Sequence, residues 1–185
     1  VNKDTIIPVK GPNRKFFTSF YIGAGSVFGT ANADSYIPMQ NFKSWEFRYG
    51  ISFKIKATNW YALVMNLDYS RQAFFQEPNA IDVRYDKLIL NNVGAAVLNR
   101  INFGKRGNSV GNYFELGGSA QYAIIARKKF LSVNNDKDAE YKSTKFTFNG
   151  PNYVNRLNYY ADVRIGFKQY VVYGKYLLSD ILNKK

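Results

Sequence analysis

The stretch Trp45-Glu-Phe-Arg-Tyr-Gly-Ile-Ser-Phe-Lys-Ile-Lys-Ala57 decides the fold class of this chain. Every second residue, from Trp45 to Ala57, is apolar or aromatic, and no residue between them is apolar. Side chains of a β-strand point alternately to the two faces of a sheet. A period of two over thirteen residues therefore predicts a strand with one apolar and one polar face.

Six further segments carry the composition or the alternation of strands. They are residues 16–28, 61–70, 89–103, 114–124, 157–167 and 170–178. The last of them is rich in aromatic and β-branched residues, but its two faces are ambiguous. Residues 141–148 also alternate, which predicts a hairpin that extends beyond the rest of the sheet.

The connections between these strands sort by length. Short turns are expected at Thr58-Asn59, 104–111 and Lys168-Gln169, all at one end of an up-and-down meander, and long connections at 29–43, 75–86 and 127–155 at the other. Long strands, aromatic residues near their ends and this asymmetry of loops are typical of outer-membrane barrels. We therefore expect an all-β fold, a transmembrane antiparallel up-and-down β-barrel in the cell outer membrane, with its apolar face in lipid.

The expected organisation is an N-terminal periplasmic segment, residues 1–15, followed by an outer-membrane β-barrel domain, residues 16–185. Bacterial barrels built from one chain have even numbers of strands, eight or more, whereas seven strands are clear here. An eighth strand is therefore expected after Lys185. A weaker option closes the barrel with Thr5 to Val9, although Pro8 argues against a central position for that segment.

Composition removes several function classes. The 185 residues include neither Cys nor His, so disulfides, thiolate metal sites and a histidine base are excluded. The formal net charge is +13, and the basic residues are scattered. Such a pattern favours outer-membrane lipid, lipopolysaccharide or other envelope proteins as partners, and it disfavours nucleic acid. No cofactor motif is present, so no cofactor and no metal are expected.

Alternation also predicts which charges point into the lumen. The expected lumen charge network consists of Glu46, Arg48, Asp68, Arg100, Glu115, Arg156, Asp162 and Arg164. Because an isolated buried charge is costly, we interpret these groups as neutralising one another across a narrow, filled interior. Catalysis by a carboxylate pair, Asp68 with Asp162 or Glu46 with Glu115, stays open as an alternative. Gly23 and Gly25 are expected to leave room for a large lumen residue opposite them.

Three segments resemble the PorT-like outer-membrane β-barrel domains of Bacteroidota: Asn112-Tyr-Phe-Glu-Leu-Gly-Gly118, Asp162-Val-Arg-Ile-Gly-Phe167 and Tyr173-Gly-Lys-Tyr-Leu-Leu-Ser-Asp180. The resemblance covers the last four strands in sequence and the first three only in pattern. It implies an eight-stranded barrel in which a further strand follows the Leu-Ser-Asp segment. It also implies a structural or accessory role, which for some members lies in secretion machinery.

The resulting hypothesis is a non-enzymatic outer-membrane β-barrel, a structural or accessory subunit of a larger cell-envelope complex for secretion or assembly. No catalytic residue is assigned. A narrow channel, a ligand-binding barrel and a lumenal outer-membrane enzyme remain as alternatives.

Overall fold

The computed structural model describes residues 11–28, 40–76, 83–103, 111–133, 143–150 and 154–181. They form eight β-strands: β1 Phe16–Ser26, β2 Trp45–Lys56, β3 Tyr61–Gln76, β4 Val83–Phe103, β5 Asn112–Val133, β6 Ser143–Asn149, β7 Leu157–Phe167 and β8 Tyr170–Leu177. Two short 3-10 helices, η1 Gly11–Asn13 and η2 Asn41–Lys43, precede β1 and β2. Within the described ranges, no helix is long and apolar enough to cross a membrane.

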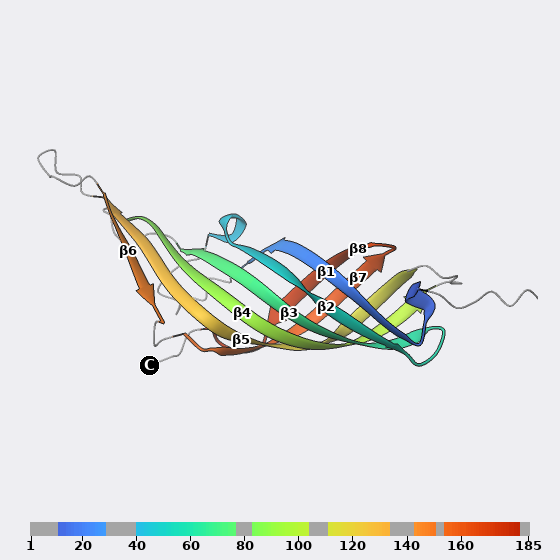
Figure 1. Cartoon of the computed structure of the whole chain (residues 1–185). Coiled ribbons are helices and arrows are strands. Elements are labelled where there is room, and N and C mark those ends of the chain that lie inside the picture. Colours follow the sequence, from blue (N-terminus) through green and yellow to red (C-terminus); the bar gives the residue numbers. More distant parts are fainter. Residues whose placement is uncertain are drawn as a thin grey trace, which may run out of the picture.

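The strands form one antiparallel sheet that curls into a half-barrel (Figure 1). Its order is β1-β2-β3-β4-β5-β7-β8, so each strand except β6 lies beside its neighbours in an up-and-down meander. β5 is long enough to pair with two strands, with β7 over residues 113–122 and with β6 over residues 127–133. The predicted all-β, up-and-down antiparallel architecture is confirmed, and each of the seven segments predicted as strands from residues 16 to 178 is present.

The β5–β6 hairpin also confirms the predicted extension around residues 141–148, since β6 covers Ser143–Asn149 and pairs only with β5. β6 projects at the end of the sheet opposite the tight turn between β7 and β8 (Figure 1). The segment Thr5–Val9 lies outside the described residues, as do most of the predicted connections 29–43 and 104–111.

Three strands are longer than their alternation predicted. β3 continues to Gln76, β4 begins at Val83 and β5 continues to Val133, so the predicted connections 75–86 and 127–155 are partly strand. The extensions pair with one another, as Gln76 with Asp86 and Leu88 with Lys128 show. Backbone pairing with a neighbouring strand, which alternation does not report, is the reason for the extra length.

A β-bulge in β5 explains why the alternation of the predicted strand 114–124 does not continue through the rest of β5. Asn91 pairs with Ile125 and Asn92 with Ala123, so one extra residue, Ile124, stands opposite this step. An extra residue shifts the parity of every position that follows it. Before the bulge, odd-numbered residues of β5 face the inside of the curve, and after it the even-numbered ones do.

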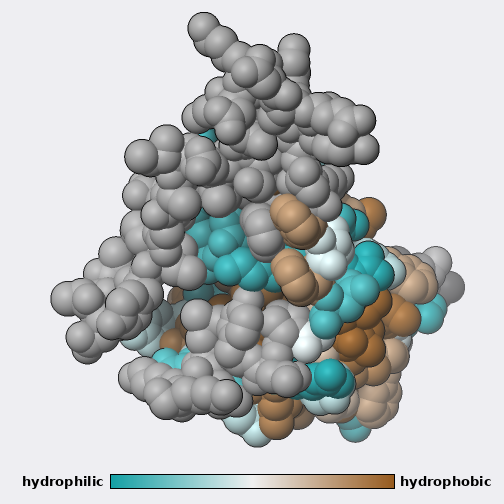
Figure 2. All heavy atoms as spheres, turned by 90° about the vertical axis from the view of Figure 1, so that its left-hand side faces the viewer, coloured by the Kyte–Doolittle hydropathy of each residue, from teal (hydrophilic) through white to brown (hydrophobic). Residues whose placement is uncertain are grey.

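The two faces of the sheet carry opposite chemistry. Apolar side chains on the convex face are exposed, among them Phe20 (83%), Leu67 (55%) and Val97 (52%), whereas Glu115 and Asp162 on the concave face are at most 2% exposed. Figure 2, viewed from the β6 end, shows brown hydrophobic residues along the outer right-hand side of the molecule. In a water-soluble barrel the apolar face would be the buried one.

A small apolar cluster lies on the concave side near the β6 end. It contains Phe74, Leu88, Leu90 and Val154, with Val27, Ala126 and Ile181 packed against it. Val27 follows β1 and Ile181 follows β8, which are the two edge strands of the sheet. The cluster therefore draws the two edges of the half-barrel toward each other.

Gly117 of β5 lies too close to the neighbouring strand to accept a side chain. A methyl group at Gly117 of β5 would overlap the backbone carbonyl of Val97 and lie 2.8 Å from the Cα of Leu98, whereas one at Gly174 of β8 would meet nothing within 4 Å. Because backbone cannot move aside easily, Gly117→Ala is expected to lower the free energy of unfolding by about 1–3 kcal/mol. Denaturant unfolding with Gly174→Ala as the control, expected within about 0.5 kcal/mol of the parent, checks this; equal effects would refute it.

Candidate functional site

The concave face holds a cluster of charged side chains centred on Arg48. Arg48 and Glu46 are two residues apart on β2 and therefore point to the same face. The Glu46 Oε1 accepts hydrogen bonds from Arg48 Nη2 at 2.5 Å and from Nε at 3.1 Å. Arg48 Nη1 lies 3.9 Å from Asp68 Oδ2, which also accepts a hydrogen bond of 2.9 Å from the Tyr21 hydroxyl. Strands β1, β2 and β3 thus meet at one buried guanidinium.

A second charged pair lies at Asp162 and Arg164 of β7. Arg164 Nη2 is 3.9 Å from Asp162 Oδ1, and the Asp162 side chain is fully buried. Neither oxygen of Asp162 has a hydrogen-bond partner among the described residues. Lys175 of β8 stands directly across from Asp162 in the β7–β8 pairing, and its Nζ lies 4.2 Å from the centre of the Tyr160 ring. Asp162 is therefore stabilised through charge more than through hydrogen bonds.

A third pair, Arg100 with Glu115, lies nearer the short-turn end. These residues are direct cross-strand partners in β4 and β5, and Arg100 Nη2 is 2.5 Å from Glu115 Oε1. The guanidinium also stacks on the Tyr113 ring, with its Cζ 3.9 Å from the ring centre. Such a close, partly stacked geometry is what a buried arginine needs to offset the loss of its hydration.

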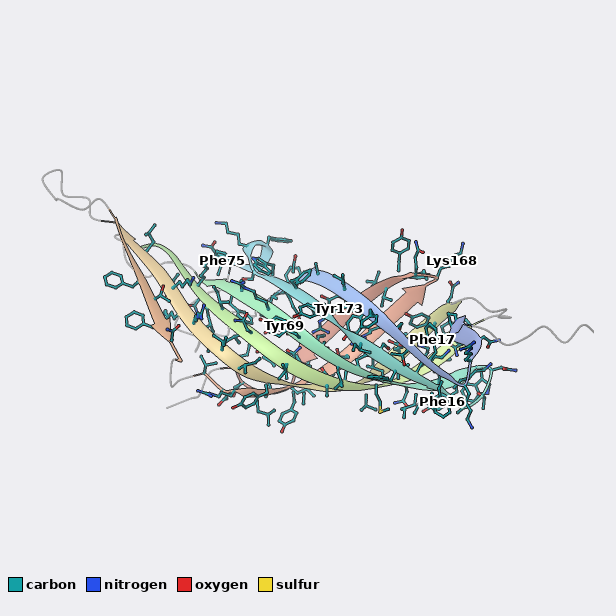
Figure 3. The ribbon with its side chains drawn as sticks, in the orientation of Figure 1. Phe16, Phe17, Tyr69, Phe75, Lys168 and Tyr173 are labelled. Atoms are coloured by element: carbon teal, nitrogen blue, oxygen red, sulfur yellow. The ribbon has the colours of Figure 1, made fainter. Side chains whose placement is uncertain are left out.

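Tyr173 of β8 joins the last strand to the first across the interior. Its ring centre is 5.2 Å from Arg48 Cζ, and an added methyl group at Gly25 of β1 would lie 3.0 Å from its hydroxyl oxygen. At Gly23 such a methyl group would lie 3.4 Å from the Tyr173 ring. Figure 3 labels Tyr173 in the middle of the curved sheet. The two glycines do leave room for a large residue opposite them, as the sequence predicted.

The structure places the eight predicted network residues in three groups. Glu46, Arg48, Asp68, Asp162 and Arg164 lie buried on the concave face and Arg100 with Glu115 forms the separate pair, whereas Arg156 is exposed. The prediction for Arg156 is wrong because β7 begins only at Leu157. Alternation holds within a strand and cannot be projected past its end.

The carboxylates contact cations in this arrangement. Glu46 contacts Arg48 and Glu115 contacts Arg100. The two carboxylates considered as a catalytic pair, Glu46 and Glu115, therefore each contact a different arginine. Asp68 and Asp162 likewise have Arg48 and Arg164 as their ion partners. Each carboxylate thus lies beside a guanidinium of opposite charge, an arrangement that suits charge neutralisation in the interior.

Sequence reasoning missed Tyr21, Tyr173 and Lys175. Tyr21 has the same parity as Gly23 and Gly25, a signal that could have placed it in the interior. Tyr173 and Lys175 lie in β8, where the run Tyr170-Val171-Val172-Tyr173 hides the alternation. Only the pairing of Lys175 with Asp162 decides which face of β8 is inside.

In the described part of the chain, no three acidic, histidine or cysteine residues lie together as a possible metal site. No family model, no curated protein and no solved structure matches this chain.

Proposed function

We propose that this chain is a membrane-spanning outer-membrane β-barrel with a non-enzymatic, structural or accessory role in a larger cell-envelope complex. The observation that carries the proposal is the inverted distribution of side chains: exposed apolar residues on the convex face and buried ion pairs on the concave one. Soluble monomers rarely expose contiguous apolar patches larger than a few hundred Å². In a membrane these exposed apolar side chains would contact lipid hydrocarbon instead of water, which is favourable.

The height of the apolar face suits a bilayer. On β4 it runs from Val93 to Phe103, both exposed, which is ten residue steps. Ten steps span roughly 34 Å along a strand. At a tilt of about 40° this is roughly 26 Å along the barrel axis, against an apolar band of about 25 Å in outer-membrane barrels.

Aromatic residues lie at both ends of this band. Near its β6 end, Tyr49 and Tyr69 stack with ring centres 5.3 Å apart, and both are cross-strand neighbours in β2 and β3. Near the short-turn end, Phe167 and Tyr170 face each other across β7 and β8. Two such rows are the expected positions of interfacial girdles.

Closure of the barrel follows from strand direction. Seven strands in an up-and-down meander leave β1 and β8 running in the same direction, so these two edges cannot pair as antiparallel neighbours. One further strand between them would be antiparallel to both and would give an even number. We propose the completed form as an eight-stranded barrel, in keeping with the resemblance to PorT-like domains.

The filled interior supports a structural role over a wide pore. An eight-stranded barrel leaves room for little more than its own side chains. Here Arg48, Tyr173 and the ion pairs around them occupy that space from opposite strands. The β5–β6 hairpin, projecting beyond the other strands, is available for contacts with envelope partners (Figure 1).

Membrane fractionation tests the proposal. The full chain, expressed in a Gram-negative host, is expected to stay in the membrane pellet after an alkaline carbonate wash and to migrate differently on gels before and after boiling. A closed barrel resists unfolding in detergent until it is heated, which is the reason for the mobility shift. Release by carbonate into the soluble fraction would refute a membrane-spanning barrel.

A further inference from the structure

We propose that the convex face binds the phosphate groups of an anionic membrane lipid through Arg71, Lys87, Arg127 and Lys129, just beyond the tyrosine row at the β6 end. The inference rests on the proposed membrane-spanning function, and it names a ligand class and the residues that hold it.

The four basic residues lie together on three neighbouring strands. Lys87 of β4 and Lys129 of β5 are direct cross-strand partners, and Arg127 is two residues from Lys129 on the same strand. Arg71 of β3 pairs with Asn91 of β4. Directly opposed residues of an antiparallel pair have Cα atoms about 4.5–5.5 Å apart, so Lys87 and Lys129 are close enough to contact one anion, whereas Arg71 lies opposite a position four residues along β4 from Lys87.

Their orientation follows from the buried residues between them. Leu88 and Leu90 point into the apolar cluster on the concave side, so Lys87 points to the convex side. After the bulge in β5, Ala126 packs on the same inner cluster, which turns Arg127 and Lys129 outward. Of these, Arg127 is exposed and Lys129 half-buried.

No acid shares this face within the described strands β3, β4 and β5. Their acidic residues are Asp68, Asp86 and Glu115, and all three face the concave side. Asp86 contacts Lys128 there, with Oδ2 and Nζ 3.0 Å apart.

The place of these residues along the strands favours a lipid headgroup over a soluble anion. Arg71 follows Tyr69 by two positions, roughly 7 Å along the strand. Arg71 pairs with Phe47 of β2 on one side and with Asn91 of β4 on the other, and Asn91 in turn pairs with Ile125 of β5. Phe47 and Ile125 are both exposed. A phosphate at the basic residues would thus sit just outside the hydrocarbon, with its acyl chains along the apolar face.

Within the described strands β4, β7 and β8, the outward residues at the opposite end of the convex face are not basic. There the outward residues of β4, β7 and β8 are Phe103, Phe167 and Tyr170, all apolar or aromatic. In Figure 3, Phe75 marks the basic end, and Phe16 and Lys168 mark the other. Phosphate binding is therefore assigned to the leaflet on the β6 side.

The test uses the full chain in detergent with two probes, bisphosphorylated lipid A and the same lipid with its phosphates removed. The triple variant Arg71→Gln, Arg127→Gln, Lys129→Gln is compared with a control of equal charge change, Arg14→Gln, Lys15→Gln, Lys168→Gln, whose sites are exposed at the opposite end of the sheet. We expect the parent to prefer the phosphorylated lipid, the first variant to lose about tenfold or more of that affinity, and the control to keep it.

Equal affinity for the two lipids, or an equal loss in the control, would overturn the inference. Full competition by inorganic phosphate at equimolar concentration would also overturn it, because a soluble-anion site would then suffice. Carbonate retention of each variant is measured alongside. A retained chain without phosphate preference contradicts this inference alone, whereas a released parent contradicts the proposed function.

Discussion

Replacing Val97 with arginine is expected to lower the free energy of unfolding in lipid vesicles by about 2–4 kcal/mol. Val97 is 52% exposed on the convex face of β4 and lies near the middle of the apolar band, between Val93 and Phe103. A guanidinium there would have to leave water for hydrocarbon. On a water-exposed surface the same change would cost about 0.5 kcal/mol or less.

Phe146→Arg is the matched control for that experiment. Phe146 is an exposed aromatic residue on β6, in the hairpin that extends past the band. Its replacement is expected to change the free energy of unfolding far less than Val97→Arg does. Denaturant titrations of the refolded chain in vesicles measure both. Equal effects of the two substitutions would contradict a lipid-facing position for Val97.

Replacing Arg48 with methionine is expected to lower the free energy of unfolding by about 3–5 kcal/mol. The substitution leaves the buried carboxylates of Glu46 and Asp68 without the guanidinium that now contacts both. It also removes the cation that lies over the Tyr173 ring. Losing one partner of a buried pair costs more than the pair itself contributes, because the remaining charge stays desolvated.

A double variant separates this charge effect from simple loss of packing. Glu46→Gln added to Arg48→Met removes one of the stranded charges and is expected to recover about 1 kcal/mol or more. Arg156→Met is the control at an exposed arginine and is expected to stay within about 0.5 kcal/mol of the parent. If the double variant were less stable than Arg48→Met alone, ion pairing would not be the main contribution of Arg48.

Strand type and face were predictable wherever alternation was strict. Trp45 to Ala57 shows its period of two in the sequence, and β2 has the predicted faces, with Arg48 buried and Phe47 exposed. The same rule placed Asp162 and Arg164 inside. These predictions succeed because neighbouring side chains of a strand must point to opposite faces, whatever the rest of the chain does.

Tertiary structure decided what depends on pairing between strands. The bulge opposite Asn91 and Asn92, the inner face of β8 and the length of β5 all come from register with a neighbouring strand. The choice of ion partners, Arg48 with Glu46 and Arg100 with Glu115, depends on distances across the curved sheet. Alternation is a property of one strand alone, whereas register and curvature arise only when several strands lie together, so a single sequence pattern could not contain them.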